Sequence, residues 1–311
     1  MNAAWLRTGL RLGRAVAFPA AVVLVAVMAV RALAKLDLSQ VDVVPLVLAL
    51  APFGVWWLLL ARAWALVHSG RVLRSDLRMW CRTQALRYLP GGVWAPVSRA
   101  VAVEGRMLDR VSTVAAENVV ALCAALAVGG VALGVSRSPL WLATVVVAAL
   151  PAAAAGVTGR LGRLDRDRLT RATVNDIIAF VAYAGAAVLV QVAVSGTDEP
   201  LAVAGAAAIA WAAGLIVILT PGGIGVREVV YVSLLSGTGI TRSALVAGAV
   251  TGRVLTIVVE LGVLVVLGRA GGTGHAQAVP RLRRVRFRDT APPAGGNPGE
   301  EARLADRDSG R

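Results

Sequence analysis

The chain is poor in cysteine, lysine and aromatic residues, and it carries little charge for its length. Among 311 residues there are two cysteines, one lysine and 5% aromatic residues, and 16% of the residues are charged. Cys81, beside a basic stretch, and Cys123, inside an apolar run, are too few for a disulfide framework. A disordered chain would have a far more polar composition. These shortages exclude a disulfide-stapled secreted domain and a disordered chain.

What the chain has instead is apolar sequence in long, continuous runs. Hydrophobic residues, mainly Ala, Val and Leu, make up 57% of the chain, and the mean hydropathy is +0.72. A soluble globular enzyme does not contain repeated apolar runs of about 20 residues, the length at which a helix crosses a bilayer. The runs do not alternate, which disfavours a transmembrane barrel. The sequence therefore predicts an all-α fold, a polytopic integral membrane helical bundle.

The apolar runs predict the spans. They lie at about 15–33, 43–65, 111–134, 139–156, 173–194, 200–219 and 243–267. A shorter run at 226–238 reaches only about 20 Å as a helix, less than the hydrocarbon core of about 30 Å. It is a half-helix, a tilted short span or a re-entrant element. A cytoplasmic tail requires an even number of crossings, so we count this run and predict about eight spans, with about seven as the alternative.

The positions of the arginines orient these spans. Segment 66–110 carries eight arginines and segment 157–172 carries five, whereas 195–199 carries none. The excess of basic residues on the cytoplasmic side of membrane proteins places the first two segments in the cytoplasm, together with residues 1–14. Residues 15–267 then form the membrane domain, and 268–311 form a disordered, basic cytoplasmic tail. The predicted location is the cell membrane, with both termini cytoplasmic.

The net charge of +14 is carried almost entirely by arginine, because Lys35 is the single lysine. This preference, with the abundance of alanine, indicates a GC-rich genome and hence a bacterial source. Because most arginines lie between apolar runs, topology and anionic lipid head groups explain the charge, and no nucleic-acid partner is predicted.

The cytoplasmic segment 68–110 contains a basic amphipathic stretch at 71–88. Its arginines recur at steps of three and four, and apolar side chains lie largely opposite: Arg71, Arg74, Arg78 and Arg82 against Val72, Leu73, Met79 and Trp80. The pattern predicts a helix at the membrane interface that gathers anionic head groups. The alternative is a solvated charged face.

Two Pro-Gly-Gly triplets interrupt the chain, each followed by an arginine. The first is Pro90-Gly91-Gly92 before Arg99, and the second is Pro221-Gly222-Gly223 before Gly225, Arg227 and Glu228. Proline cannot continue a helix, and irregular backbone at membrane depth is tolerated only where it lines a cavity or is buried in protein. Such broken segments in two halves of a chain point to a transporter-type site. A helix starting after Gly225 would direct its N-terminal amides at an anionic group such as a phosphate. The alternative is two ordinary loops.

Ionisable residues inside the spans are the other candidates for a binding site. Arg253, Thr256 and Glu260 lie on one face of the last span, and Glu117 lies about two turns into the third. A charge near the bilayer centre costs about 2.5–3.5 kcal/mol to insert, so such a residue is a functional candidate. We expect Glu117 to pair with Arg99 or Arg253. The alternatives are a contact between Arg253 and Glu260 that only neutralises both, and interfacial positions for the two acids.

Some chemistry is absent from the sequence. There is no Walker loop, and His68 and His275 are too far apart to indicate a metal site, so no cofactor or metal is expected. The stretch Asp165-Arg166-Asp167 matches a pattern that could hold a metal–sugar nucleotide, but such short matches are common in charged loops. No catalytic residue is proposed, and the question of enzymatic activity stays open, with a non-enzyme favoured.

The two motifs resemble a known family. Tyr-Leu-Pro-Gly-Gly-Val-Trp at 88–94 and Thr-Pro-Gly-Gly-Ile-Gly-Val-Arg-Glu at 220–228 are similar to segments of the flippase-like transmembrane domain of lysylphosphatidylglycerol synthases. The resemblance covers about residues 10–270 and implies an all-helical domain that moves a lipid or lipid-linked head group between leaflets. In the full synthases a soluble aminoacyl-tRNA-dependent transferase domain follows. The segment 268–311 is too short for that domain, so lysyl transfer is not expected here.

Three functions remain open. The first is a lipid translocase in which Arg227 and Arg253 bind the phosphate of an anionic phospholipid or a polyprenyl-phosphate-linked glycolipid, while Glu117 and Glu260 balance the charge. The second is a non-catalytic membrane subunit for a separate cytoplasmic lipid-modifying enzyme, such as a glycosyltransferase. The third is an integral-membrane transferase, which the short loops disfavour.

Overall fold

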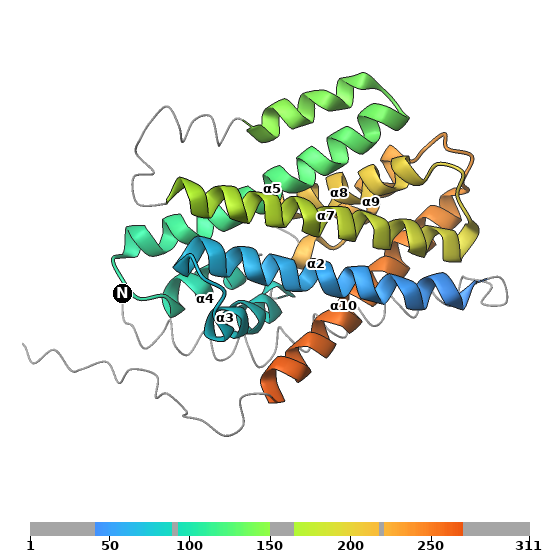
Figure 1. Ribbon diagram of the computed structural model, residues 1–311. Helices are drawn as coiled ribbons and strands as arrows, with labels where there is room; N and C mark the ends of the chain where they lie inside the picture. Colours follow the sequence, from blue (N-terminus) through green and yellow to red (C-terminus); the bar gives the residue numbers. More distant parts are fainter. Residues whose placement is uncertain (1–40, 89–92, 150–164, 218–220, 270–311) are drawn as a thin grey trace, which may run out of the picture. The chain divides into compact units, whose positions relative to one another are not determined.

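The computed structural model describes residues 41–88, 93–149, 165–217 and 221–269, and all elements in these ranges are helices (Figure 1). The predicted N-terminal segment and first span, the first Pro-Gly-Gly triplet and nearly all of the predicted tail lie outside these residues.

Four helices are long and apolar enough to cross a membrane. They are α2 (Val43–Ser69), α5 (Met107–Ser136), α7 (Arg166–Ser195) and α10 (Arg242–Arg269). The apolar helices α8 (Pro200–Ile216) and Pro139–Ala149 are shorter. These helices confirm the predicted fold class, a polytopic membrane bundle made of α-helices.

Local chemistry fixes where the long helices begin and end. The Asp42 carboxylate accepts a hydrogen bond from the Val44 amide at 2.9 Å and caps the start of α2. Gly70 ends that helix with φ of 71°, a left-handed conformation that glycine adopts without steric cost. Asp165 caps α7 through the Asp167 amide at 3.0 Å. Helix α2 ends at Ser69, beyond the predicted run 43–65, and α7 begins at Arg166, ahead of the predicted run 173–194.

The helices α2 and α7 lie side by side (Figure 1), and aromatic residues fill the space between them. Phe53 and Trp56 of α2 contact Tyr183 of α7, with ring centroids 5.8 and 4.9 Å apart. Trp57 and Trp64 of α2 are also fully buried. Most of the aromatic residues in the described ranges are therefore buried in the protein interior, next to the site described below.

The helices α5 and α8 cross at glycine. A Cβ atom on Gly205 of α8 would lie 2.9 Å from the backbone nitrogen of Leu133 and 3.0 Å from the carbonyl oxygen of Gly129, both in α5. No larger residue fits there without moving a backbone. Small residues at a crossing are a usual way to pack helices within a membrane, where van der Waals contact replaces the hydrophobic effect.

The predicted amphipathic helix 71–88 is shorter than expected. It is α3 (Arg74–Gln84), continued by the 3₁₀ turn η2 (Ala85–Tyr88) and followed by α4 (Trp94–Ala102). Arg71 precedes the helix. The apolar face of α3 packs into the bundle, since Trp80 and Cys81 are each 1% exposed. Burial, with a contribution from the Glu260 carboxylate, raises the pKa of the Cys81 thiol to about 12. Thus α3 is anchored in the protein through this face.

The second Pro-Gly-Gly triplet forms the short turn η4 (Pro221–Gly223), and α9 (Val226–Leu234) follows. With nine residues, α9 is about 14 Å long, too short to cross the hydrocarbon core by itself. The helix is thus shorter than the predicted run 226–238, and the prediction of about eight spans stays a prediction. The half-helix is the alternative that fits.

Candidate functional site

The second break depends on three glycines in left-handed conformations. The φ angles are 58° at Gly222, 73° at Gly223 and 87° at Gly225. A side chain at these positions would be strained, so the sequence Pro-Gly-Gly-Ile-Gly is what allows the chain to turn here. The Glu228 carboxylate accepts a hydrogen bond from the Gly225 amide at 2.6 Å and closes the first turn of α9. The predicted role of Glu228 as a group for the substrate is not tested by this contact.

The break packs directly against α8. A Cβ atom on Gly223 would lie 2.8 Å from the Gly214 Cα and carbonyl oxygen, and a Cβ on Gly214 would overlap the Arg227 side chain. Arg227 thus lies across Gly214, with its guanidinium carbon 5.3 Å from the centre of the Trp211 ring. The glycines of the break and of α8 make room for one arginine.

Arg253 and Glu260 of α10 contact two different segments of the chain. Arg253 Nη2 donates to the Gly222 carbonyl oxygen at 2.6 Å and so ties α10 to η4. Glu260 pairs with Arg87 of η2 at 2.5 Å, and the Arg87 guanidinium lies 4.9 Å above the Trp57 ring. The alternative in which Arg253 and Glu260 neutralise one another is therefore wrong. Each connects α10 to a different segment.

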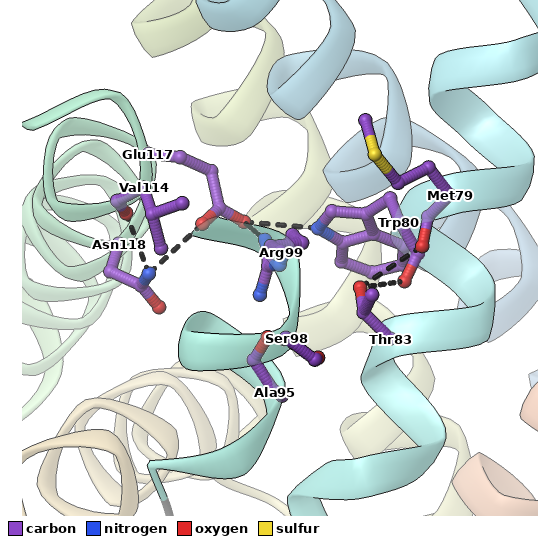
Figure 2. Close-up of polar contacts among 9 residues, drawn as sticks. All are labelled: Met79, Trp80, Thr83, Ala95, Ser98, Arg99, Val114, Glu117 and Asn118. Atoms are coloured by element: carbon purple, nitrogen blue, oxygen red, sulfur yellow. Dashed lines mark hydrogen bonds and ion pairs between the residues drawn. The ribbon is translucent and has the colours of Figure 1, made fainter. Parts of the chain in front are cut away.

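A second ion pair lies between α4 and α5 (Figure 2). Arg99 Nη1 is 2.8 Å from Glu117 Oε1, and the two side chains are 1% and 6% exposed. Glu117 also accepts hydrogen bonds from Trp80 Nε1 and Asn118 Nδ2, each at 3.0 Å. The Arg99 guanidinium lies 5.3 Å from the centre of the Trp64 ring. Arg99, one of the two partners predicted for Glu117, is thus the partner that the structure gives it.

These groups surround a cavity of about 250 Å³. Arg99, Glu117, Gly222, Gly223 and Arg227 line it, together with Arg87, Trp80 and Trp211. A smaller cavity of about 50 Å³ is lined by Arg227 again and by Glu228, Arg253 and Thr256. The structure therefore brings most of the predicted site residues to two neighbouring cavities that share Arg227. Pro90, Gly91 and Gly92 are outside the described residues.

Several arginine side chains at the larger cavity have a guanidinium nitrogen that donates no hydrogen bond to a described residue. Within the described part of the chain, Arg227 Nε and Arg99 Nε are buried and make no hydrogen bond. Buried polar groups are usually hydrogen-bonded, and an exception requires an explanation. Arg227 has no carboxylate partner among the described residues, whereas Arg87 and Arg99 each have one. The arrangement can accept an anion at Arg227.

Sequence reasoning missed four residues of this site: Arg87, Trp57, Trp80 and Trp211. In the sequence, Arg87 is one of many arginines in a cytoplasmic segment, and Trp80 lies on the apolar face of a helix expected at the membrane interface. A signal existed, because Arg87 directly precedes the first motif.

Thr256, which lines the smaller cavity, donates a hydrogen bond to the Gly252 carbonyl oxygen at 2.8 Å within its own helix. In the described ranges, no group of three or more His, Cys, Asp or Glu side chains could hold a metal ion.

Long apolar helices, a broken segment between two of them, and buried arginines at a cavity define a polytopic membrane protein with an internal polar site. The family model described as Lysylphosphatidylglycerol synthase TM region matches residues 160–263. This part of the chain, which contains the second motif, is similar to that family, and the predicted resemblance is confirmed there. The first motif precedes the matched residues. No curated protein matches the chain.

Proposed function

We propose that this protein is a lipid translocase that binds the anionic head group of a lipid in the cavity at the second Pro-Gly-Gly break. The observation that carries the proposal is Arg227. Its Nε is buried without a hydrogen bond in the described residues, and its side chain lines both cavities. A guanidinium held in this way offers paired donors in the geometry that phosphate oxygens accept.

The balance of charge supports a singly charged anion. At the larger cavity, Arg99 is paired with Glu117, and Arg87 with Glu260. Among the described residues, Arg227 and Arg253 line the smaller cavity with one carboxylate, that of Glu228, so one positive charge is left over, which is costly in a buried site unless a counter-charge arrives. A phosphodiester carries a single negative charge. The head group of an anionic phospholipid, or the phosphate of a polyprenyl-phosphate-linked glycolipid, therefore suits this site.

The shape of the site supports the same proposal. The lipid tails remain in the bilayer, and only the head group enters between the helices. Irregular backbone at η4 exposes the Gly222 carbonyl to Arg253, as expected where a broken helix lines a polar cavity. The proposal includes a cell-membrane location with both termini in the cytoplasm. Movement is either passive or coupled to ions through the acids.

The test is head-group translocation by the full chain in proteoliposomes. Labelled phosphatidylglycerol, an aminoacylated phosphatidylglycerol and a polyprenyl-phosphate sugar are compared, with Arg227→Gln as the site variant. Loss of a charged hydrogen bond should slow movement by about 10- to 100-fold. Arg137→Gln is the matched control, because Arg137 forms a partly exposed ion pair with Glu199 at 3.4 Å.

Movement of one lipid, slowed in Arg227→Gln and unchanged in Arg137→Gln, would support the proposal. If folded protein moves none of the lipids, the translocase is refuted. The membrane-subunit function would then gain weight, and the next step would be to look for a lipid-modifying enzyme that purifies with the chain.

A further inference from the structure

A groove on the α2–α7 pair lies apart from the two cavities. Its volume is about 570 Å³, and three arginines line it. Arg62 comes from α2, Arg71 from the turn after α2, and Arg171 from the second turn of α7. No acidic side chain is among the described residues that line the groove. The groove therefore concentrates positive charge at one end of the helix pair.

The donors of these arginines are largely unused within the described chain. Arg171 Nε donates to the Asp167 backbone carbonyl at 3.3 Å. Arg62 and Arg71 have no ion pair or side-chain hydrogen bond to any described residue. Three guanidinium groups without carboxylate partners repel one another, and an anion between them relieves that repulsion.

The rest of the groove is apolar. Leu59 and Leu66 of α2 line it together with Val174 and Ile178 of α7. Val174 and Ile178 are 53% and 54% exposed, and Val181, about one turn further along α7, is 57% exposed. Such a stripe on a membrane-spanning helix contacts acyl chains. Arginines at one end of an apolar stripe match the two parts of a phospholipid.

The floor of the groove is fixed in place. Asn175 is buried, and its Nδ2 donates to the Leu59 carbonyl oxygen of α2 at 2.7 Å. The Arg168 side chain packs on Gly70, so that a Cβ there would lie 2.7 Å from Arg168 Nε. These contacts hold α2 and α7 together independently of a ligand, which lowers the cost of ordering the groove when a lipid binds.

We propose that this groove binds one anionic phospholipid of the surrounding leaflet as a lipid that is not transported. The phosphate lies among Arg62, Arg71 and Arg171, and the acyl chains lie along Val174 and Ile178. The proposal does not depend on translocation through the cavity, because it rests on a different pair of helix faces.

The experiment measures lipid binding to the purified full chain in a neutral detergent. Phosphatidylglycerol, phosphatidylcholine and inorganic phosphate are titrated separately, and bound lipid is counted by native mass spectrometry. All variants carry Arg227→Gln to remove binding at the cavity. The site variant is Arg62→Gln/Arg171→Gln. The control, Arg74→Gln/Arg82→Gln, removes the same charge from positions on α3 that are equally exposed but do not line the groove.

We expect phosphatidylglycerol to bind and phosphatidylcholine to bind far more weakly. The site variant should weaken phosphatidylglycerol binding by about a hundredfold, since two charged hydrogen-bonding groups are lost. The control should weaken it by less than about threefold, as expected for screened surface charges. Val174→Trp, which fills the apolar part without changing charge, should also weaken binding.

Three results would overturn the proposal. Equal losses in the site variant and the control would mean diffuse attraction to a basic surface. Inorganic phosphate that displaces phosphatidylglycerol at equal concentration would identify a site for the free anion. Normal binding in Val174→Trp, in protein with the melting temperature of the parent, would show that the groove is not where the acyl chains lie.

Discussion

Removal of the Glu117 charge should destabilise the protein strongly, because it strands a buried guanidinium. Glu117 neutralises Arg99 at 2.8 Å and accepts hydrogen bonds from Trp80 and Asn118. In Glu117→Gln the amide oxygen can still accept from Trp80, so the loss is mainly the ion pair. Breaking a buried pair by removing one partner costs about 3–5 kcal/mol. We expect this loss in the free energy of unfolding.

The partner variants separate the charge from the shape of the site. Arg99→Met leaves the Glu117 carboxylate without its cation, but this carboxylate keeps its two hydrogen-bond donors. The loss in the free energy of unfolding should therefore be about 3 kcal/mol, the lower end of the range. In Arg99→Met/Glu117→Gln neither charge is buried alone. The double variant should therefore be more stable than the sum of the single losses by about 2 kcal/mol or more.

Denaturant titration in mixed micelles, followed by the fluorescence of the eight tryptophans, measures these energies. Glu199→Gln is the control, since its ion pair with Arg137 is partly exposed and should change stability by less than about 1 kcal/mol. A Glu117→Gln loss as small as that of the control, or strictly additive losses in the double variant, would refute the reasoning.

Three further predictions concern the break, a crossing and a thiol. Arg253→Leu should abolish translocation in folded protein, because the hydrogen bond that ties α10 to Gly222 is lost; unchanged transport would remove Arg253 from the site. Gly205→Ala should lower the melting temperature through its clash with α5, whereas Gly262→Ala, with no atom within 4 Å of its added Cβ, should raise stability by about 0.5–1 kcal/mol. Cys81, whose pKa is raised to about 12, should react with a maleimide at pH 9 far more slowly in native than in unfolded protein. Because the pKa of the Cys81 thiol is raised in the folded protein, the thiol contributes stability that is present below its ordinary pKa and is lost as the pH rises towards 12. Equal rates of maleimide labelling in native and unfolded protein would contradict the burial of this thiol.

The long helices follow from the sequence because a bilayer demands about 20 apolar residues in a row, and α2, α5, α7 and α10 each supply them. The second break could also be predicted, since three glycines after a proline leave few other conformations. The extent of α9 could not. Its apolar run continues to residue 238, but the helix ends at Leu234.

The pairing of charges could not be predicted, because it depends on which helices are neighbours. From the sequence, Arg99 and Arg253 are both possible ion-pair partners of Glu117. The packing of α4 against α5 makes Arg99 the partner. Asn175 and Asp176 lie near the end of an apolar run and look interfacial in sequence, yet both are buried. Helix α7 begins at Arg166, about two turns before its apolar run, so these residues lie well inside the helix and not at its end.

The glycine crossing of α5 and α8 has a mechanical consequence. The two backbones approach closely there, and the Leu133 and Ile209 side chains pack against the glycine of the opposite helix, so a sliding movement of one helix past the other would create clashes. Glu117 sits on one member of the pair and Trp211 on the other, which makes the pair the stationary wall of the cavity. We therefore expect a change in the size of the cavity to come from the other segments that line it, η2, η4 and the start of α9, because left-handed glycines occupy η4 and the position before α9.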